Sequence, residues 1–223
     1  MRDVIAMLCL GLSIASPAVA AAPGNDAATA GVKAALELGA DKALAVLGRQ
    51  DGYLGDPDVR IPLPGKLQKG RKLLDKLGMK KQTAALELTI NRVAEMALPQ
   101  ARQLIIDAIG RASPEDAVAI VNGPQDAATR YFRNTMAAPL ATAFQPIVAK
   151  VAADLQLSRT YDAVAAKARE AGLTDQDSSL DAYVTHKALD GLFLMMTREE
   201  AAIREDPSGQ ANPLLGEVFG GHR

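Results

Sequence analysis

The stretch 180-LDAYVTHKALDGLFLMM-196 carries apolar side chains on nearly all sides of a helix from Ala188 onward. A helix on the surface of a globular protein has one apolar stripe, whereas a helix that is apolar almost all round is buried. Ser178, followed three residues later by Asp181, predicts the N-terminal cap of this helix. We therefore expect a long helix here, at the centre of a helical bundle.

Apolar residues recur at helical spacing through the rest of the chain, and no segment of useful length alternates as a strand does. Two clear stripes are Val32, Leu36, Ala40, Ala43, Leu47 and Leu86, Ile90, Val93, Ala97. Ser113 and Ser158 are expected helix caps, and Pro139 and Pro146 are expected to interrupt the helical stretch between them. The sequence predicts an all-α, single-domain bundle of about eight to ten helices over residues 31–219.

A proline-rich stretch, 59-VRIPLPGKLQK-69, breaks the helical pattern. Ile61 and Leu63 each precede a proline, which favours extended backbone and places both side chains on one face. We expect residues 57–65 to form an extended strap that inserts both side chains into the core. A helix is expected to follow from Gly65 to Gly78, with Leu67, Leu74 and Leu77 on its buried stripe.

The N-terminus has the pattern of a secretory signal peptide. A short basic start precedes the apolar run 4-VIAMLCLGLSIA-15 and small residues at Ala18 and Ala20. We expect residues 1–20 to be the signal peptide, with cleavage after Ala20 or Ala22, and residues 21–30 to be a flexible N-terminus. The expected location is the periplasm, with no transmembrane segment after cleavage.

The composition excludes several kinds of site. The one cysteine lies within the signal peptide, so the mature chain would have no disulfide, thiol nucleophile or cysteine-ligated zinc. Only two histidines exist, and no calcium-loop motif occurs, so we expect no metal site and no cofactor. Tryptophan is absent and the net charge is −1, which makes nucleic acid an unlikely partner.

The near-zero net charge hides two oppositely charged segments. Residues 60–81 carry eight cations against the single anion Asp75. Residues 170–206 carry nine anions against three cations, and they include Glu199 and Glu200, which we expect on the surface. The candidate binding residues of the basic segment are Lys66, Lys69, Arg71, Lys72 and Lys76.

This basic segment has two interpretations. A basic amphipathic helix can dock on an anionic envelope component or on a protein partner. The alternative is a solvated helix face, partly neutralised by the acidic segment of the same chain. The first interpretation predicts a non-enzymatic binding protein.

A second candidate site involves the central helix. His186 and Asp190 lie four residues apart on one face, and a buried Asp190 would need a cationic partner. The stretch 128-ATRYFR-133 offers Arg130 and Arg133, with Tyr131 as a hydrogen-bond donor. These residues would form either the polar site of an enzyme or small-ligand receptor, or a structural pair that fixes the register of two helices.

Three stretches together resemble the bacterial family known as domain of unknown function 4197. They are 51-DGYLGDPDVRIPLPGKLQK-69, 127-AATRYFR-133 with the preceding Asp126, and 183-YVTHKALDGLFLMM-196. The resemblance extends from about Gly31 to Phe219 and implies a secreted helical protein of Gram-negative bacteria. It implies no particular activity, and it transfers no catalytic role to His186.

Overall fold

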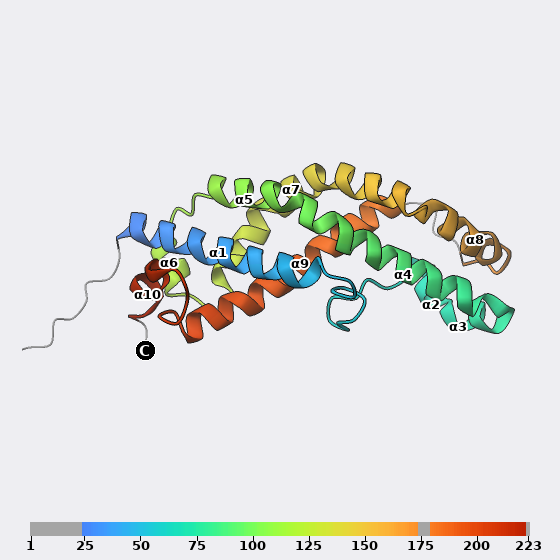
Figure 1. Cartoon of the computed structure of the whole chain (residues 1–223), viewed down its shortest axis with the longest axis horizontal. Helices are drawn as coiled ribbons and strands as arrows, with labels where there is room; N and C mark the ends of the chain where they lie inside the picture. The colour runs from blue at the N-terminus through green and yellow to red at the C-terminus, as the bar shows by residue number, and fades with distance from the viewer. Residues whose placement is uncertain (1–23, 174–178, 222–223) are drawn as a thin grey trace, which may run out of the picture.

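The computed structural model describes residues 24–173 and 179–221 and is all-α, as the sequence predicts (Figure 1). The expected signal peptide, residues 1–20, lies outside the described residues. The elements follow in chain order: α1 (Asn25–Leu47), α2 (Gly65–Lys69), α3 (Arg71–Leu74), the π-helical turn η1 (Asp75–Met79), α4 (Lys80–Ala97), the 3₁₀ turn η2 (Leu98–Ala101), α5 (Arg102–Arg111), α6 (Ala117–Val121), α7 (Ala127–Asp154), α8 (Leu157–Glu170), α9 (Leu180–Glu205) and α10 (Pro213–Phe219).

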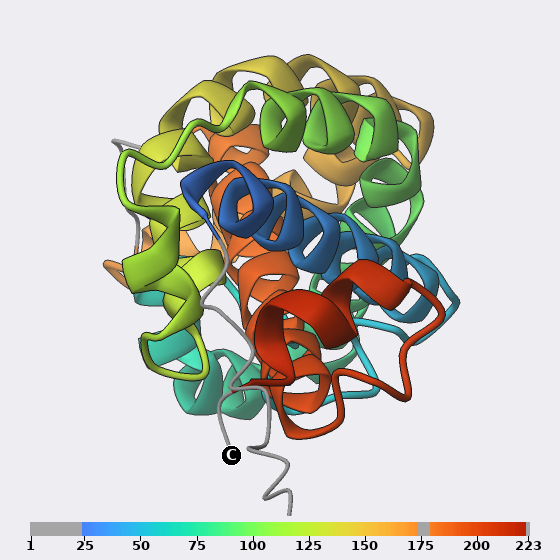
Figure 2. The same ribbon diagram turned by 90° about the vertical axis from the view of Figure 1, so that its left-hand side faces the viewer.

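The long helix α9 crosses the middle of an elongated bundle. It packs against α1, α7 and α4, and Figure 2, which views the long axis end-on, shows it in orange with α7 on one side and α1 on the other. Phe193 of α9 meets Phe132 of α7 edge to face, with ring centroids 6.1 Å apart. The predicted central position of this helix is confirmed, because it packs against three other helices and its buried residues cover more than half of its circumference.

The proline-rich strap inserts Ile61 and Leu63 into the core as predicted, and both side chains are buried. Its predicted bounds, 57–65, are wrong, because residues 57–59 form a turn and Gly65 begins α2. Residues 60–64 have no regular secondary structure. The side chain of Asn91 accepts a hydrogen bond from the Ile61 amide at 2.9 Å and donates to the Ile61 carbonyl at 2.8 Å. The Tyr183 hydroxyl donates to the Pro62 carbonyl at 2.9 Å. The strap therefore joins α4 to α9.

The turn before the strap is held by a second polar residue of α4. Glu95 is buried and accepts hydrogen bonds from the backbone amides of Tyr53 and Leu54, each at 3.1 Å. The buried Tyr53 hydroxyl donates to the Ala188 carbonyl of α9 at 2.7 Å. Asn91 and Glu95 lie four residues apart, so one face of α4 satisfies the backbone groups that the non-helical segment leaves unpaired.

Several predicted boundaries are wrong. The first helix begins at Asn25 and Ala28 is buried, so most of the expected flexible segment 21–30 is helical. Asp116, and not Ser113, caps α6 by accepting from the Ala119 amide. Ser179 caps α9, since its side chain accepts from the Ala182 amide, whereas Ser178 lies outside the described residues. Ser158 does not cap α8, because it lies inside that helix, which begins at Leu157 after the N-cap residue Gln156.

Pro139 and Pro146 do not interrupt α7, which runs for 28 residues. Both prolines lie on the exposed side of the helix. Each removes one backbone hydrogen bond, and the carbonyl that it frees belongs to an exposed residue, Thr135 or Thr142, where water can serve as the partner. The packing of the opposite face keeps the helix continuous.

Candidate functional site

Residues 66–81 do not form the single helix that the sequence predicts. The chain makes two short helices, α2 and α3, then the turn η1, and then enters α4. Gly70 lies between α2 and α3, and a Cβ atom there would lie 2.3 Å from a Leu173 methyl carbon, so a larger residue would force Leu173 to move. Within η1, Gly78 interrupts the helical backbone with a φ of +82°, a conformation that favours glycine. We call residues 66–81 the basic tip.

The basic tip lies at one end of the elongated molecule, at the right-hand end of Figure 1 beside α8. Leu67 and Leu74 are buried and attach it to the core. Its outer side carries exposed cations, which are Lys66, Lys69, Lys72, Lys76, Lys80 and Lys81. The candidate lysines of the sequence are thus gathered at one pole of the molecule.

Two leucines accompany these cations on the outside. Leu73 is 44% exposed and Leu77 is 46% exposed. The prediction that Leu77 belongs to the buried stripe is wrong, because η1 and Gly78 turn the chain away from the core after Leu74. The exposed side of the basic tip is therefore both cationic and apolar.

Arg71 has a different role from the lysines. Its guanidinium forms a salt bridge with Glu87 of α4 at 2.5 Å, and both side chains are partly buried. This pair fixes α3 on α4. We therefore assign Arg71 to the support of the basic tip, although the sequence suggested it as a binding residue.

The acidic segment has ion-pair partners outside the basic tip. In the part of this segment that the structure describes, Glu170 pairs with Lys167, Asp190 with Arg133 and Lys187, Glu199 with Lys42, and Glu200 with Arg204. Three acidic side chains of α9, those of Asp190, Glu199 and Glu200, are thus paired with cations that lie outside the basic tip.

The second candidate site is assembled only in part. Arg133 pairs with Asp190 at 2.9 Å, as expected, and Lys187 reaches the same carboxylate at 3.2 Å. The expectation that Asp190 is buried is wrong, since its side chain is 46% exposed and that of Arg133 is 54% exposed. His186 is also exposed. Residues 186, 190, 194 and 198 are spaced four apart and therefore lie on one face of α9. All four are exposed or half-buried, so they form a strip of α9 that no neighbouring helix fully covers.

A groove of about 330 Å³ lies between α7 and α9 beside this pair. Arg130 and Arg133 line one wall, and the Arg133 guanidinium carbon lies 5.7 Å from the centre of the Phe193 ring. Arg130 faces Asp126 at 3.7 Å. Tyr131 is half-buried and does not line the groove. The groove thus contains two arginines, of which Arg133 lies over the Phe193 ring, and neither His186 nor Asp190 lines it.

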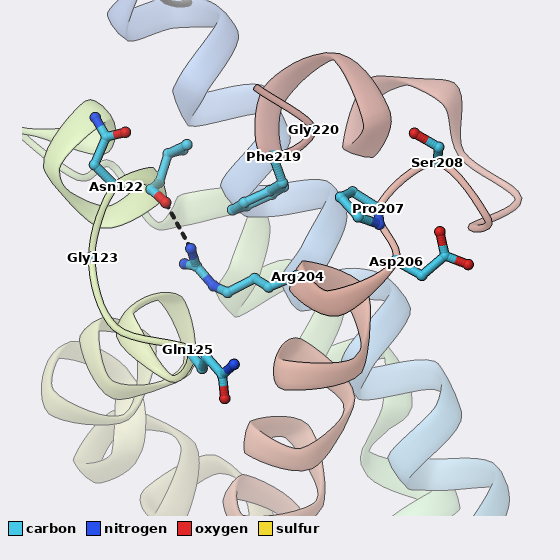
Figure 3. A pocket seen from close by; sticks show the side chains of 10 residues that line it. Asn122, Gly123, Gln125, Arg204, Asp206, Pro207, Ser208, Phe219 and Gly220 are labelled. Atoms are coloured by element: carbon cyan, nitrogen blue, oxygen red, sulfur yellow. Dashed lines mark hydrogen bonds between the residues drawn. The ribbon is translucent and has the colours of Figure 1, made fainter. Parts of the chain in front are cut away.

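A larger cavity, of about 530 Å³, lies at the opposite end of the molecule between α6 and α10 (Figure 3). Figure 3 shows Arg204 reaching across its floor toward the Val121 carbonyl, with the Phe219 ring above it. Arg204 is paired with Glu200, and the sequence prediction that Glu200 lies on the surface is wrong. This charged pair holds helix ends together, and we assign it a structural role.

Sequence reasoning missed the buried polar residues Asn91, Glu95 and Glu200. The sequence contained a signal for Asn91 and for Glu200. Asn91 interrupts the apolar stripe that contains Ile90 and Val93, and Glu200 precedes Arg204 by four residues, the spacing of an ion pair on one helix face. Polar residues within an apolar stripe indicate a buried hydrogen-bond network.

Within residues 24–173 and 179–221, no group of three histidine, cysteine or carboxylate side chains could hold a metal ion.

In the same ranges, one helix, α7, is long and apolar enough to cross a membrane by length and composition alone. Core helices of soluble proteins also meet these two criteria, so the expected absence of a transmembrane segment stays a prediction.

Among comparisons with known proteins, only the comparison with family models gives a match. No curated protein and no solved structure matches the chain. The model of the family described as protein of unknown function (DUF4197) matches residues 22–220, which include every element of the bundle. The chain therefore belongs to the DUF4197 family, as the three stretches of its sequence had indicated.

Proposed function

We propose that this protein binds an anionic component of the bacterial cell envelope through the basic tip and catalyses no reaction. The proposal includes a periplasmic location, for which the support is the signal-peptide pattern at the N-terminus. The observation that carries it is the gathering of exposed lysines at one end of an elongated molecule.

The expected affinity of the basic tip for an anionic surface comes from the charges of its exposed lysines. A lysine near an anionic lipid surface contributes about 1 kcal/mol, and this contribution falls as salt screens it. Lys69, Lys72 and Lys76 together would contribute about 3 kcal/mol, or ~100-fold in affinity. Because the tip is attached through Leu67 and Leu74 and braced by Arg71, these lysines can be changed without removing a buried contact.

The test compares two triple variants with equal change in charge. Lys69→Gln/Lys72→Gln/Lys76→Gln removes three cations from the basic tip. Arg49→Gln/Arg111→Gln/Lys150→Gln removes three exposed cations from other parts of the bundle. Binding is measured by sedimentation with phosphatidylglycerol vesicles, and by retention on heparin, at increasing sodium chloride.

We expect the wild-type protein and the control variant to bind at low salt and to be released as salt rises. The tip variant should bind ~100-fold more weakly to the vesicles. Equal binding by the two triple variants would contradict the assignment of the tip as the contact surface.

The groove between α7 and α9 supports a second candidate function, the binding of a small anionic ligand. Two arginines on one wall, three residues apart, can receive a carboxylate or phosphate with charge-assisted hydrogen bonds. The test uses succinate and inorganic phosphate as probes. Binding raises the unfolding temperature of the wild-type protein as ligand concentration increases, and Arg130→Gln should abolish this rise. An equal rise in the variant would exclude the groove as the site.

A further inference from the structure

The basic tip exposes apolar side chains as well as cations. Among the residues that the structure describes, the large apolar side chains left exposed are Leu73, Leu77, Leu88, Met96 and Leu194. Single exposed apolar residues are ordinary on protein surfaces. Leu73 and Leu77 differ because they lie four residues apart in consecutive helical turns, so that both face the same side of the tip.

The tip has an inner and an outer side. Leu74, next to Leu73 in the chain, is fully buried against the core, and Leu67 anchors α2 in the same way. Gly78 ends the helical turn directly after Leu77, and the space beside its α-carbon is open. The described residues of the chain leave Leu73 44% exposed and Leu77 46% exposed.

Lysines lie close to the two leucines in the chain. Lys69 ends α2 just before the break at Gly70, Lys72 and Lys76 are the chain neighbours of Leu73 and Leu77, and all three lysines are exposed. Long lysine side chains can lay their methylene stems on an apolar surface while the ammonium group reaches into a polar layer. This pattern places charge around an apolar centre.

The exposed lysines and the exposed leucines together favour one kind of anionic partner. A soluble polyanion would pair with the lysines and leave both leucines in water. An anionic phospholipid bilayer offers phosphates for the lysines and an acyl layer for the leucines at the same surface. We infer that the envelope component bound by the basic tip is an anionic phospholipid bilayer, with Leu73 and Leu77 inserted below its headgroups.

This inference rests on the proposed function and makes it more specific. Two leucines are too small an anchor to hold a protein on a membrane permanently, and a cluster of cations alone is screened by salt. The combination gives peripheral and reversible binding, which depends on both kinds of residue.

The first experiment compares two double variants. Leu73→Gln/Leu77→Gln changes the tip, whereas Met96→Gln/Leu194→Gln changes two exposed apolar residues elsewhere. Because all four side chains are exposed, neither variant opens a hole in the core. We expect the tip variant to lose about tenfold or more in affinity for phosphatidylglycerol vesicles and to keep its affinity for heparin. The control variant should keep both affinities.

The second experiment uses a single tryptophan as a probe. The chain contains no tryptophan, so Leu77→Trp introduces the only one. Its emission should shift to shorter wavelength on phosphatidylglycerol vesicles and be quenched by brominated acyl chains. Salt-sensitive vesicle binding without this shift and quenching would overturn the insertion and leave the proposed function standing. A wild-type protein that binds neither vesicles nor heparin would overturn both.

Discussion

Glu200 and Arg204 form an ion pair one turn apart on α9, at 2.8 Å, and their side chains are only 3% and 10% exposed. Glu200 accepts hydrogen bonds from the Ala128 and Thr129 amides at the start of α7. Arg204 donates to the Ile120 and Val121 carbonyls at the end of α6. One ion pair thus satisfies the ends of two helices and joins both to a third.

The buried pair should make Glu200 important for stability and Glu199 unimportant. Glu200→Gln leaves the Arg204 charge without its buried partner, which should lower the free energy of unfolding by about 3 kcal/mol. Glu199→Gln removes only a partly exposed contact with Lys42 and should cost about 0.5 kcal/mol or less. Urea denaturation of both variants measures the difference, and equal losses would contradict the capping role of Glu200.

The strap should depend on Asn91. Asn91→Leu keeps the number and branching of the side-chain heavy atoms but leaves the amide and carbonyl of Ile61 buried without partners, which should cost about 3 kcal/mol. The exposed Asn134→Leu serves as the control and should change stability little. Hydrogen exchange at the Ile61 amide gives the local readout. Unchanged protection of that amide in Asn91→Leu would show that another group holds the strap.

Two tyrosines should make the strap sensitive to alkaline pH. Burial raises the pKa of the Tyr183 hydroxyl to about 12. Burial, with a contribution from the Glu95 charge, raises the pKa of Tyr53 well above its usual value. Both hydroxyls therefore stay protonated in the folded protein at a pH at which they ionise in the unfolded chain. Their contribution to stability is complete below pH ~10 and is lost as pH rises toward 12.

The variant that tests this effect is Tyr53→Phe/Tyr183→Phe. It should be less stable than the wild type at pH 8, because both hydroxyls donate to backbone carbonyls. Between pH 9 and pH 11 its free energy of unfolding should fall less steeply than that of the wild type. Parallel curves would mean that other groups cause the alkaline loss.

The proposed periplasmic location predicts a processed N-terminus. The mature protein, isolated after expression of the full chain with its own leader, should begin at Ala21 or Pro23. Intact-mass measurement of the protein from periplasmic and cytoplasmic fractions checks this. An unprocessed chain that begins at Met1 and stays with the membrane fraction would contradict the cleavage.

The helical class and the strap were predictable because their signals are local. Helical spacing identifies buried faces, and the two prolines next to Ile61 and Leu63 force extended backbone. The close contact of Gly70 with Leu173 was not predictable, since Leu173 lies about a hundred positions away in the chain. From the sequence alone, a single amphipathic helix was the natural expectation.

In the candidate sites, too, local features were predictable from the sequence and contacts between distant residues were not. The cations of the basic tip and the pairing of Arg133 with Asp190 followed from charge pattern and helical spacing. The exposure of Asp190 could not be predicted, because the sequence of α9 is apolar nearly all round. Only the packing of the neighbouring helices shows which strip of α9 is left exposed. The structural role of Arg71 likewise depends on the position of Glu87 on the neighbouring helix α4.

The most direct test of the basic tip as the contact surface is hydrogen–deuterium exchange of the full chain with and without phosphatidylglycerol vesicles. We predict that binding slows exchange in peptides that cover residues 66–81, and leaves α6, α10 and the groove between α7 and α9 unchanged. Protection confined to that groove or to the α6–α10 end, with none at residues 66–81, would contradict the proposed function.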